Sequence, residues 1–290
     1  MSSSELRALL SQHGLHLRRE LGQNFIVETQ VAERLAERAG IEAGDSVIEV
    51  GTGLGMLTRA LAKRAKFVLS LEIDSGLARV VQEEGLLPEN VRLLHADVLK
   101  QDLGALISQL EQEQGGPVRL VANLPFSSAT PLMRRLLDHR HALIDWSVML
   151  QMEVADRLFA PVGSRDYGSF AVLHHLCVEL EGRLELVAKS FFPVPRVDSA
   201  FVCVRANTRL NLAPGELRKV ERVVRAAFGK RRKTLENALR GGGLGVERDE
   251  LRAVLERLAI DPRARAETIH PEAFLALAKG LWPGAMNGVE

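Results

Sequence analysis

Short apolar runs and amphipathic segments alternate along the first half of the chain. The apolar runs, rich in β-branched residues, predict buried strands at 46–50, 67–72, 91–95, 118–122 and 145–150. Segments with helical spacing predict helices around them, at 28–39, 54–64, 75–84, 102–113 and 129–138. Such alternation is typical of βαβ units that build a parallel sheet. We therefore expect an α/β fold.

The pattern changes after residue 151. It predicts helices near 153–159 and 168–177, then strands at 183–188 and 199–206 that form a hairpin at the sheet edge. From Ala213 onward the spacing is helical: an apolar stripe at Val220–Phe228 is followed by segments expected to be helices at 232–240, 248–258 and 271–281. We expect three parts, listed in chain order: an arm with one short amphipathic piece at 1–27, a larger domain at 28–207 and a small all-helical domain at 208–290.

Composition narrows the class of protein. The chain has 290 residues, 46% of them hydrophobic, which is enough for a large core. Its two cysteines, Cys177 and Cys203, lie in apolar runs, so buried thiols in a reducing compartment are expected rather than a disulfide. No apolar segment has transmembrane length, and the N-terminus lacks the apolar core of a signal peptide. We expect a cytoplasmic enzyme with no membrane association.

A glycine-rich turn follows the first predicted strand. It reads Glu49-x-Gly51-x-Gly53-x-Gly55 and opens a helix, as in Rossmann-like sheets where a cofactor lies over the carboxyl end of the strand. A dinucleotide-binding fingerprint needs a further glycine where Met56 stands, which makes a dinucleotide oxidoreductase the weakest alternative. The turn resembles motif I of S-adenosylmethionine (SAM) methyltransferases, whose sulfonium and amino-acid tail suit a loop with a nearby carboxylate. A Gly-rich turn without a ligand is the alternative.

Polar residues also follow the next three predicted strands. Glu72 ends the second strand, where a carboxylate reaches ribose hydroxyls in Rossmann-like folds, and Asp97 follows the third, where it could accept a hydrogen bond from an adenine amine. Either acid could instead be solvated, and Asp97 could cap a helix. After the fourth strand comes Asn123-Leu124-Pro125-Phe126. It resembles the [N/D/S]-P-P-[Y/F/W]-type signature of enzymes that methylate an exocyclic amine of a base; a β-turn with a buried Phe is the alternative.

The chemistry of that reaction accounts for these residue types. An adenine N6 amine is a poor nucleophile because its lone pair is delocalised into the ring. The Asn123 side-chain oxygen and a backbone carbonyl would accept hydrogen bonds from the two N–H groups of the amine. This would aim the nitrogen lone pair at the methyl group of SAM. Pro125 would stiffen the turn, and Phe126 would stack on the extruded base.

Over nearly its full length the chain resembles the KsgA-type small-subunit rRNA adenine N6,N6-dimethyltransferases. The stretches that carry the resemblance are Gly22-Gln23-Asn24-Phe25, Glu49–Gly55, Asn123–Phe126, Tyr167-Gly168, Pro195–Ala200, Phe228–Thr234, Ile260-Asp261-Pro262 and Arg265-Ala266-Glu267. This implies a class I SAM methyltransferase domain and a helical C-terminal domain. Two positions depart from the family: Phe126 stands where Tyr is usual, and Thr52 replaces a frequent Pro.

The resemblance also implies residue roles. SAM is the expected cofactor, bound by Asn24, Ile26, Gly51, Gly53, Glu72, Asp97 and Asn123. Asn123 and Leu124 would hold the target amine on a turn stiffened by Pro125, between Phe126 and Phe191, which would sandwich the flipped base. The partner would be small-subunit rRNA in a pre-ribosomal particle, and a monomer is expected.

A basic cluster near the C-terminus suits contacts with RNA phosphates. The net charge is only +1, but Lys and Arg far outnumber the acidic residues between Arg218 and Arg240, and Lys230, Arg231, Arg232 and Lys233 are consecutive. A solvated charged face is the alternative. His95, His174 and His175 lack metal-ligand spacing, so we assign no metal.

The predicted function is SAM-dependent N6,N6-dimethylation of adenines in small-subunit rRNA. Two alternatives stay open: a large-subunit rRNA methyltransferase of the antibiotic-resistance type, and a non-catalytic RNA-binding assembly or transcription factor with the same fold.

Overall fold

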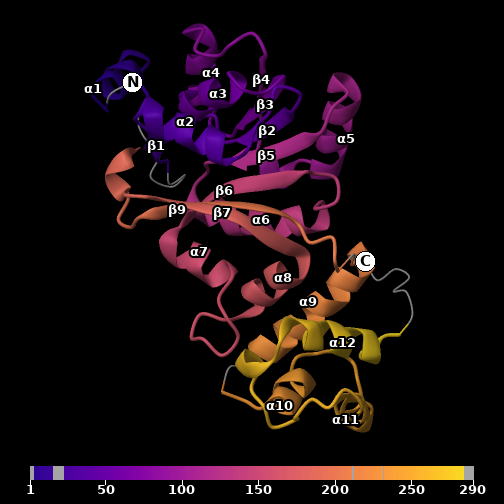
Figure 1. Cartoon of the computed structure of the whole chain (residues 1–290). Coiled ribbons are helices and arrows are strands. Elements are labelled where there is room, and N and C mark those ends of the chain that lie inside the picture. Colours follow the sequence, from indigo (N-terminus) through magenta and orange to yellow (C-terminus); the bar gives the residue numbers. More distant parts are fainter. Residues whose placement is uncertain (1–2, 16–22, 211, 231, 284–290) are drawn as a thin grey trace. The chain divides into compact units, whose positions relative to one another are not determined.

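The computed structural model describes residues 3–15, 23–210, 212–230 and 232–283 (Figure 1). Contacts between residues divide the chain into two compact units. Unit 1 comprises Met1–Met152 and Leu180–Ala206, and unit 2 comprises Glu153–Glu179 and Asn207–Glu290.

A seven-stranded sheet with the strand order β4-β3-β2-β5-β6-β9-β7 forms the centre of unit 1. The strands are β2 (Ser46–Val50), β3 (Phe67–Glu72), β4 (Val91–His95), β5 (Val118–Ala122), β6 (Asp145–Gln151), β7 (Val178–Leu186) and β9 (Ser199–Ala206). β2 to β6 are parallel, whereas β9 runs antiparallel to β6. The expected α/β fold is confirmed, and the last two strands are neighbours at the sheet edge as predicted.

Helices cover both faces of this sheet. They are α2 (Thr29–Arg38), α3 (Met56–Ala62), α4 (Ser75–Glu83), α5 (Leu103–Gln114) and α6 (Phe126–Asp138), with a 3-10 turn η2 (Val98–Lys100) after β4. α2 and α3 join Val47, Val121 and Met149 in one apolar core. The residues that alternate with these, Ile48, Leu120 and Val148, are also fully buried, so the opposite face is covered as well.

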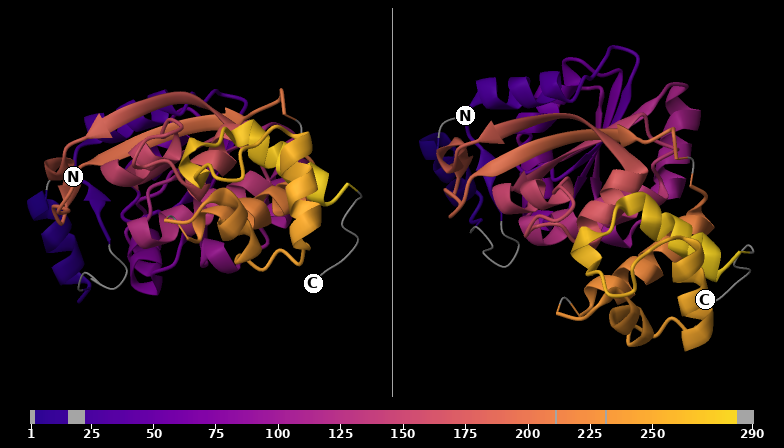
Figure 2. Two further views of the ribbon diagram at one scale, coloured as in Figure 1. Left: turned by 90° about the horizontal axis from the view of Figure 1, so that it is seen from below. Right: turned by 60° about the horizontal axis from the view of Figure 1, so that its bottom comes forward.

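A second, two-stranded sheet lies beside the N-terminal helix α1 (Ser3–Gln12). β1 (Phe25–Ile26) pairs antiparallel with β8 (Phe191–Phe192), which follows the 3-10 turn η3 (Ala188–Ser190). The views in Figures 1 and 2 agree that the connection between β7 and β9 runs beside the N-terminal elements. Arg7 of α1 also lies over the Phe192 ring, 4.7 Å from its centroid. Segments far apart in sequence therefore meet at this point.

Unit 2 is helical apart from the first residues of β7. It contains nearly all of α7 (Met152–Leu158), then α8 (Ser169–Cys177), α9 (Pro214–Phe228), α10 (Leu235–Arg240), α11 (Arg248–Arg257), a 3-10 turn η4 (Ala266–Thr268) and α12 (Pro271–Leu281). Tyr167 connects the two chain segments of unit 2, Glu153–Glu179 and Asn207–Glu290. Its hydroxyl donates to the carbonyl of Ile269 (2.8 Å), and its ring meets Phe228 edge-on.

These contacts explain why the units differ from the expected domain ranges in one segment. Residues 153–179, assigned from sequence to the larger domain at 28–207, belong to unit 2 because α8 packs against α9 and α12. The division after residue 207 and the separate arm at 1–27 stay predictions. Within the described ranges, no helix is both long and apolar enough to cross a bilayer.

Candidate active site

The glycine turn after β2 is held in a backbone conformation that only glycine adopts easily. Gly51, Gly53 and Gly55 have φ values of 92°, 56° and 74°. A Cβ on Gly51 would stand 2.4 Å from the carbonyl oxygen of Asn123. The main chains of the two predicted motifs therefore touch, and the peptide N–H of Asn123 also donates to the carbonyl of Val50 (3.0 Å).

A chain of buried hydroxyl groups supports the turn from behind. Thr58 and Ser70 both donate to Oε2 of Glu49 at 2.6 Å, and Thr52 Oγ1 lies 2.6 Å from Ser70 Oγ. Burial raises the pKa of the Glu49 carboxyl to about 7. Glu49 is fully buried and does not line the cavity, so it is not the carboxylate beside the sulfonium that its place in the motif indicated. Thr52, in place of the frequent Pro, ties the turn to β3 through its hydroxyl.

Glu72, at the end of β3, lines the cavity, whereas Glu49 does not. Its Oε2 accepts the N–H of Gly53 (2.8 Å) and its Oε1 accepts the N–H of Asp74 (2.9 Å). Burial raises the pKa of Glu72 above its ordinary value. Asp97, after β4, caps η2 by accepting the N–H of Leu99 at Oδ1 (3.0 Å) and also lines the cavity. Helix capping and a place in the cavity wall are therefore both properties of Asp97.

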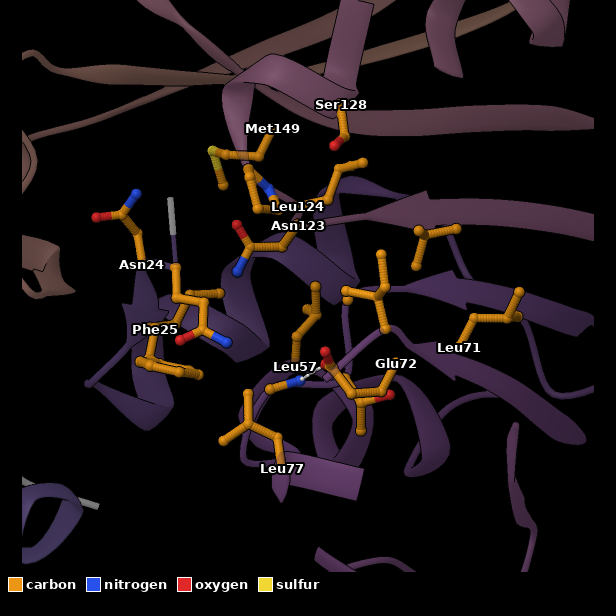
Figure 3. Close-up of a pocket in the computed structure, with 18 of the residues that line it drawn as sticks. Asn24, Phe25, Leu57, Leu71, Glu72, Leu77, Asn123, Leu124, Ser128 and Met149 are labelled. Atoms are coloured by element: carbon orange, nitrogen blue, oxygen red, sulfur yellow. Dashed lines mark hydrogen bonds between the residues drawn. The ribbon is translucent and has the colours of Figure 1, made fainter. Parts of the chain in front are cut away.

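The Asn123–Phe126 turn connects β5 to α6. Leu124 is buried, and Asn123, Pro125 and Phe126 are half-buried. Figure 3 shows Asn123 and Glu72 directed into the same cavity from the ends of β5 and β3. α6 begins at Phe126, earlier than the predicted residue 129. Pro131 lies inside the helix, where it cannot donate to the carbonyl of Ser127.

The β1–β8 pair also lines the cavity, and β1 lies beside the glycine turn, since a Cβ on Gly53 would stand 3.0 Å from the Phe25 ring. Ile26 is in register with Phe191, and Phe25 with Phe192, which brings the Asn24 motif beside the Phe191 motif. Every residue expected to bind the cofactor or the base lines this one cavity: Asn24, Ile26, Gly51, Gly53, Glu72, Asp97, Asn123, Leu124, Pro125, Phe126 and Phe191. Their individual roles stay predictions.

Other lining residues were given no role from the sequence, although Ser199 lies in the Pro195–Ala200 stretch that carries the resemblance. They include Leu6, Leu77, Ser127, Ser128, Met149 and Ser199. The short amphipathic piece predicted in the arm comprises Leu6, Leu9 and Leu10, and the structure shows it as part of α1. The sequence did not indicate what this piece covers. The position of Met149 in the cavity wall follows from the register of β6 with its neighbouring strands. Sequence alone does not provide that register.

The basic cluster follows α9 in unit 2. Lys230, Arg232 and Lys233 are exposed, and the N–H of Lys233 donates to the carbonyl of Lys230 (2.9 Å) in a tight turn. Arg231 lies outside the described residues. Within the described part of the chain, no three His, Cys, Asp or Glu side chains are grouped as metal ligands would be.

Comparison with known proteins gives a consistent match. The family model described as "Ribosomal RNA adenine dimethylase" matches residues 14–281. Proteins named "Ribosomal RNA small subunit methyltransferase A" are similar over nearly the whole chain. The one from Geobacillus thermodenitrificans is 37% identical over 96% of this chain and 95% of its own, and the one from Magnetococcus marinus is 40% identical over 96% of each.

Solved structures agree on the fold. The 23S rRNA methyltransferase ErmE has a TM-score of 0.62 at 25% identity and covers 89% of this chain and 99% of its own. A dimethyladenosine transferase from Plasmodium falciparum has a TM-score of 0.71 at 23% identity, covering 86% and 94% respectively. The class I methyltransferase fold is thereby established for this chain.

Proposed function

The chain belongs to the ribosomal RNA adenine dimethylase family, and from this premise we propose that it adds two methyl groups to the N6 amine of adenines in small-subunit ribosomal RNA. The observation that carries the proposal is that the Asn123–Phe126 turn and the Gly51–Gly55 turn line one cavity. The names of the relatives at 37% and 40% identity support the small subunit as the source of the substrate.

The residues of the cavity fit SAM as the methyl donor. Each oxygen of Glu72 accepts one backbone N–H, and a carboxylate oxygen can accept a second hydrogen bond, which leaves capacity for ribose hydroxyls. Asp97 caps η2 through Oδ1, and its Oδ2, which lies 3.8 Å from Nζ of Lys100, keeps capacity to accept a hydrogen bond from an adenine amine. Gly51 would contact the methionine part of SAM, and Asn24 and Ile26 would close over the cofactor. When bound, SAM supplies an electrophilic methyl group on a positively charged sulfur.

Asn123 and Leu124 would orient the nucleophile. The side-chain oxygen of Asn123 and the carbonyl of Leu124 would accept hydrogen bonds from the two N–H groups of the target amine. These hydrogen bonds would draw the lone pair of the nitrogen out of conjugation with the ring. The methylated nitrogen is a strong acid and loses its proton to water, so no dedicated general base is required. Positioning and electrostatics would then supply most of the rate.

Two aromatic residues would hold the flipped base. Phe191 is buried in β8 and Phe126 is half-buried at the start of α6, and both line the cavity. Stacking on an aromatic ring contributes about 1–3 kcal/mol per base. Phe keeps the stacking face of the Tyr that is usual at position 126, so we expect the reaction to be retained.

Contacts with the rest of the RNA would come from the basic cluster. Lys230, Arg232 and Lys233 are exposed, as phosphate contacts require, and Arg231 is assigned to the same role from the sequence. We propose that the chain acts as a monomer on a pre-ribosomal particle in the cytoplasm.

The test is methyl transfer from labelled SAM to immature small ribosomal subunits, with mass spectrometry of the rRNA. We expect N6,N6-dimethyladenosine in small-subunit rRNA and none in large-subunit rRNA. Label in large-subunit rRNA alone would favour the antibiotic-resistance type of enzyme. RNA binding without any transfer would favour the non-catalytic factor.

A further inference from the structure

The wall of the cavity contains a fully buried serine, Ser199. It is the first residue of β9, its relative exposure is 0%, and it lines the cavity. Within the part of the chain that the structure describes, its Oγ has no hydrogen-bond partner. A buried hydroxyl without a partner is unfavourable and uncommon in native proteins. In a cavity wall, such a group points to a ligand that supplies the missing partner.

The strand register shows which way Ser199 faces. In the antiparallel β6–β9 pair, Ser199 is opposite Gln151 and Phe201 is opposite Met149. Residues two apart on a strand share a face, and Met149 lines the cavity, as Figure 3 shows. Ser199 therefore lies on the cavity side of the sheet. Ser46 Oγ also lacks a partner among the described residues, but Ser46 does not line the cavity.

The strand order places Ser199 on the side of the base rather than of the cofactor. β9 lies two strands beyond β5, on the side away from β3 and β4, which carry Glu72 and Asp97. Two strand spacings amount to about 10 Å, so Ser199 is separated from the Asn123 turn by roughly the space that a purine with its contacts needs. Phe191 and Pro195, which precede Ser199 in the same connection, line this part of the wall.

We propose that the Ser199 hydroxyl donates a hydrogen bond to a ring nitrogen of the target adenine, an inference that rests on the proposed function. N1, N3 and N7 of adenine are acceptors, whereas the acceptors assigned to Asn123 and Leu124 engage the N6 hydrogens. N6 methylation removes an amine hydrogen but leaves the ring nitrogens unchanged. The Ser199 bond therefore survives the first transfer and holds the monomethylated base for the second.

The test pairs Ser199→Ala with Ser46→Ala. Both remove a fully buried hydroxyl without a described partner from the first residue of a strand, but only Ser199 lines the cavity. We expect Ser199→Ala to lower kcat/KM for the RNA about 10-fold, with SAM affinity and unfolding midpoint like those of Ser46→Ala. Transfer at the Ser46→Ala level would overturn the inference. Ser199→Cys, which keeps the size but is a weak donor, replaces Ser199→Ala should the latter not fold.

Substrates with 1-, 3- or 7-deazaadenosine at the target position then separate a contact with the base from a packing effect. One analogue should lower the wild-type kcat/KM about 10-fold and have no further effect in the Ser199 variant. Losses that multiply independently for all three analogues would overturn the inference. Absence of transfer by the wild-type chain would instead overturn the proposed function, so the two failures are distinguishable.

Discussion

Replacing Gly51 by alanine tests how closely the cofactor turn and the amine-binding turn depend on each other. Gly51 has a φ of 92°, where an L-residue is strained by roughly 1–2 kcal/mol. The added Cβ would stand 2.4 Å from the carbonyl oxygen of Asn123 and 3.1 Å from its carbonyl carbon. Carbon–oxygen contacts normally lie near 3.3–3.6 Å, so the two segments have to separate by about 1 Å.

A separation of that size is large on the scale of catalysis. A misplacement of about 1 Å can cost about 100-fold in rate, which corresponds to about 2.7 kcal/mol of transition-state stabilisation. We therefore expect kcat/KM of Gly51→Ala to fall about 100-fold. SAM affinity should fall as well, because the same residue is proposed to contact its methionine part.

Gly115→Ala is the matched control. Gly115 ends α5 with a φ of 64°, and a Cβ there would meet nothing within 4 Å. Both variants should lose roughly 1–2 kcal/mol of unfolding free energy in urea from backbone strain, but only Gly51→Ala should lose transfer. Equal activities in the labelled-SAM assay would refute the reasoning, since the displacement would then not reach the Asn123 amide.

Three further predictions follow from the same structure. Asn123→Ala should nearly abolish transfer while SAM affinity, measured by calorimetry, stays within a few-fold; full activity would contradict the role of its amide. Changing Lys230, Arg232 and Lys233 to Gln should make the dependence of log affinity for RNA on log salt shallower by about 2 to 3, with SAM binding unchanged; an unchanged slope would mean that the cluster is only solvated surface. Burial raises the pKa of Glu49 from 4.5 to about 7, so the folded state binds a proton that the unfolded chain releases. Stability should therefore fall by roughly 3 kcal/mol as pH rises from about 4.5 to 7. Glu49→Gln should flatten that part of the urea-unfolding profile, and equal slopes for both proteins would show that Glu49 is ionised throughout.

The strands and most helices could be predicted because each carries a strong periodic signal. β2, β3, β5 and β6 are apolar runs buried on both faces, whereas β4 is a partly exposed edge strand; the predicted bounds of all five agree with the observed ones to within a residue. The start of α6 was wrong because Asn123-Leu124-Pro125 reads as a turn whose end the sequence does not mark. β1 and β8, with two residues each, are too short to carry any periodic signal.

The cavity wall was predictable only where a motif follows a parallel strand. Glu72, Asp97 and Asn123 each come at the carboxyl end of a strand, and parallel strands bring those ends to one edge. Leu6 and Ser199 reach the cavity through tertiary packing and antiparallel register, so neither the amphipathic piece nor the Pro195–Ala200 stretch indicates that these residues line it. Glu49 shows the converse, because its position in the motif indicated a ligand-facing carboxylate whereas the fold buries it against Thr58 and Ser70.

The strand order gives a reason why the amine-binding turn follows β5. Residues proposed to hold the cofactor end β3 and follow β4, whereas Phe191 and Ser199, proposed to contact the base, precede and open β9, so β2, β5 and β6 lie between them. Of these three strands, β6 is the farthest from β3 and β4, and β2 is followed by a glycine turn whose backbone touches the carbonyl of Asn123. A side chain that accepts hydrogen bonds from the amine must therefore come from β5, and Asn123 is the first residue after it.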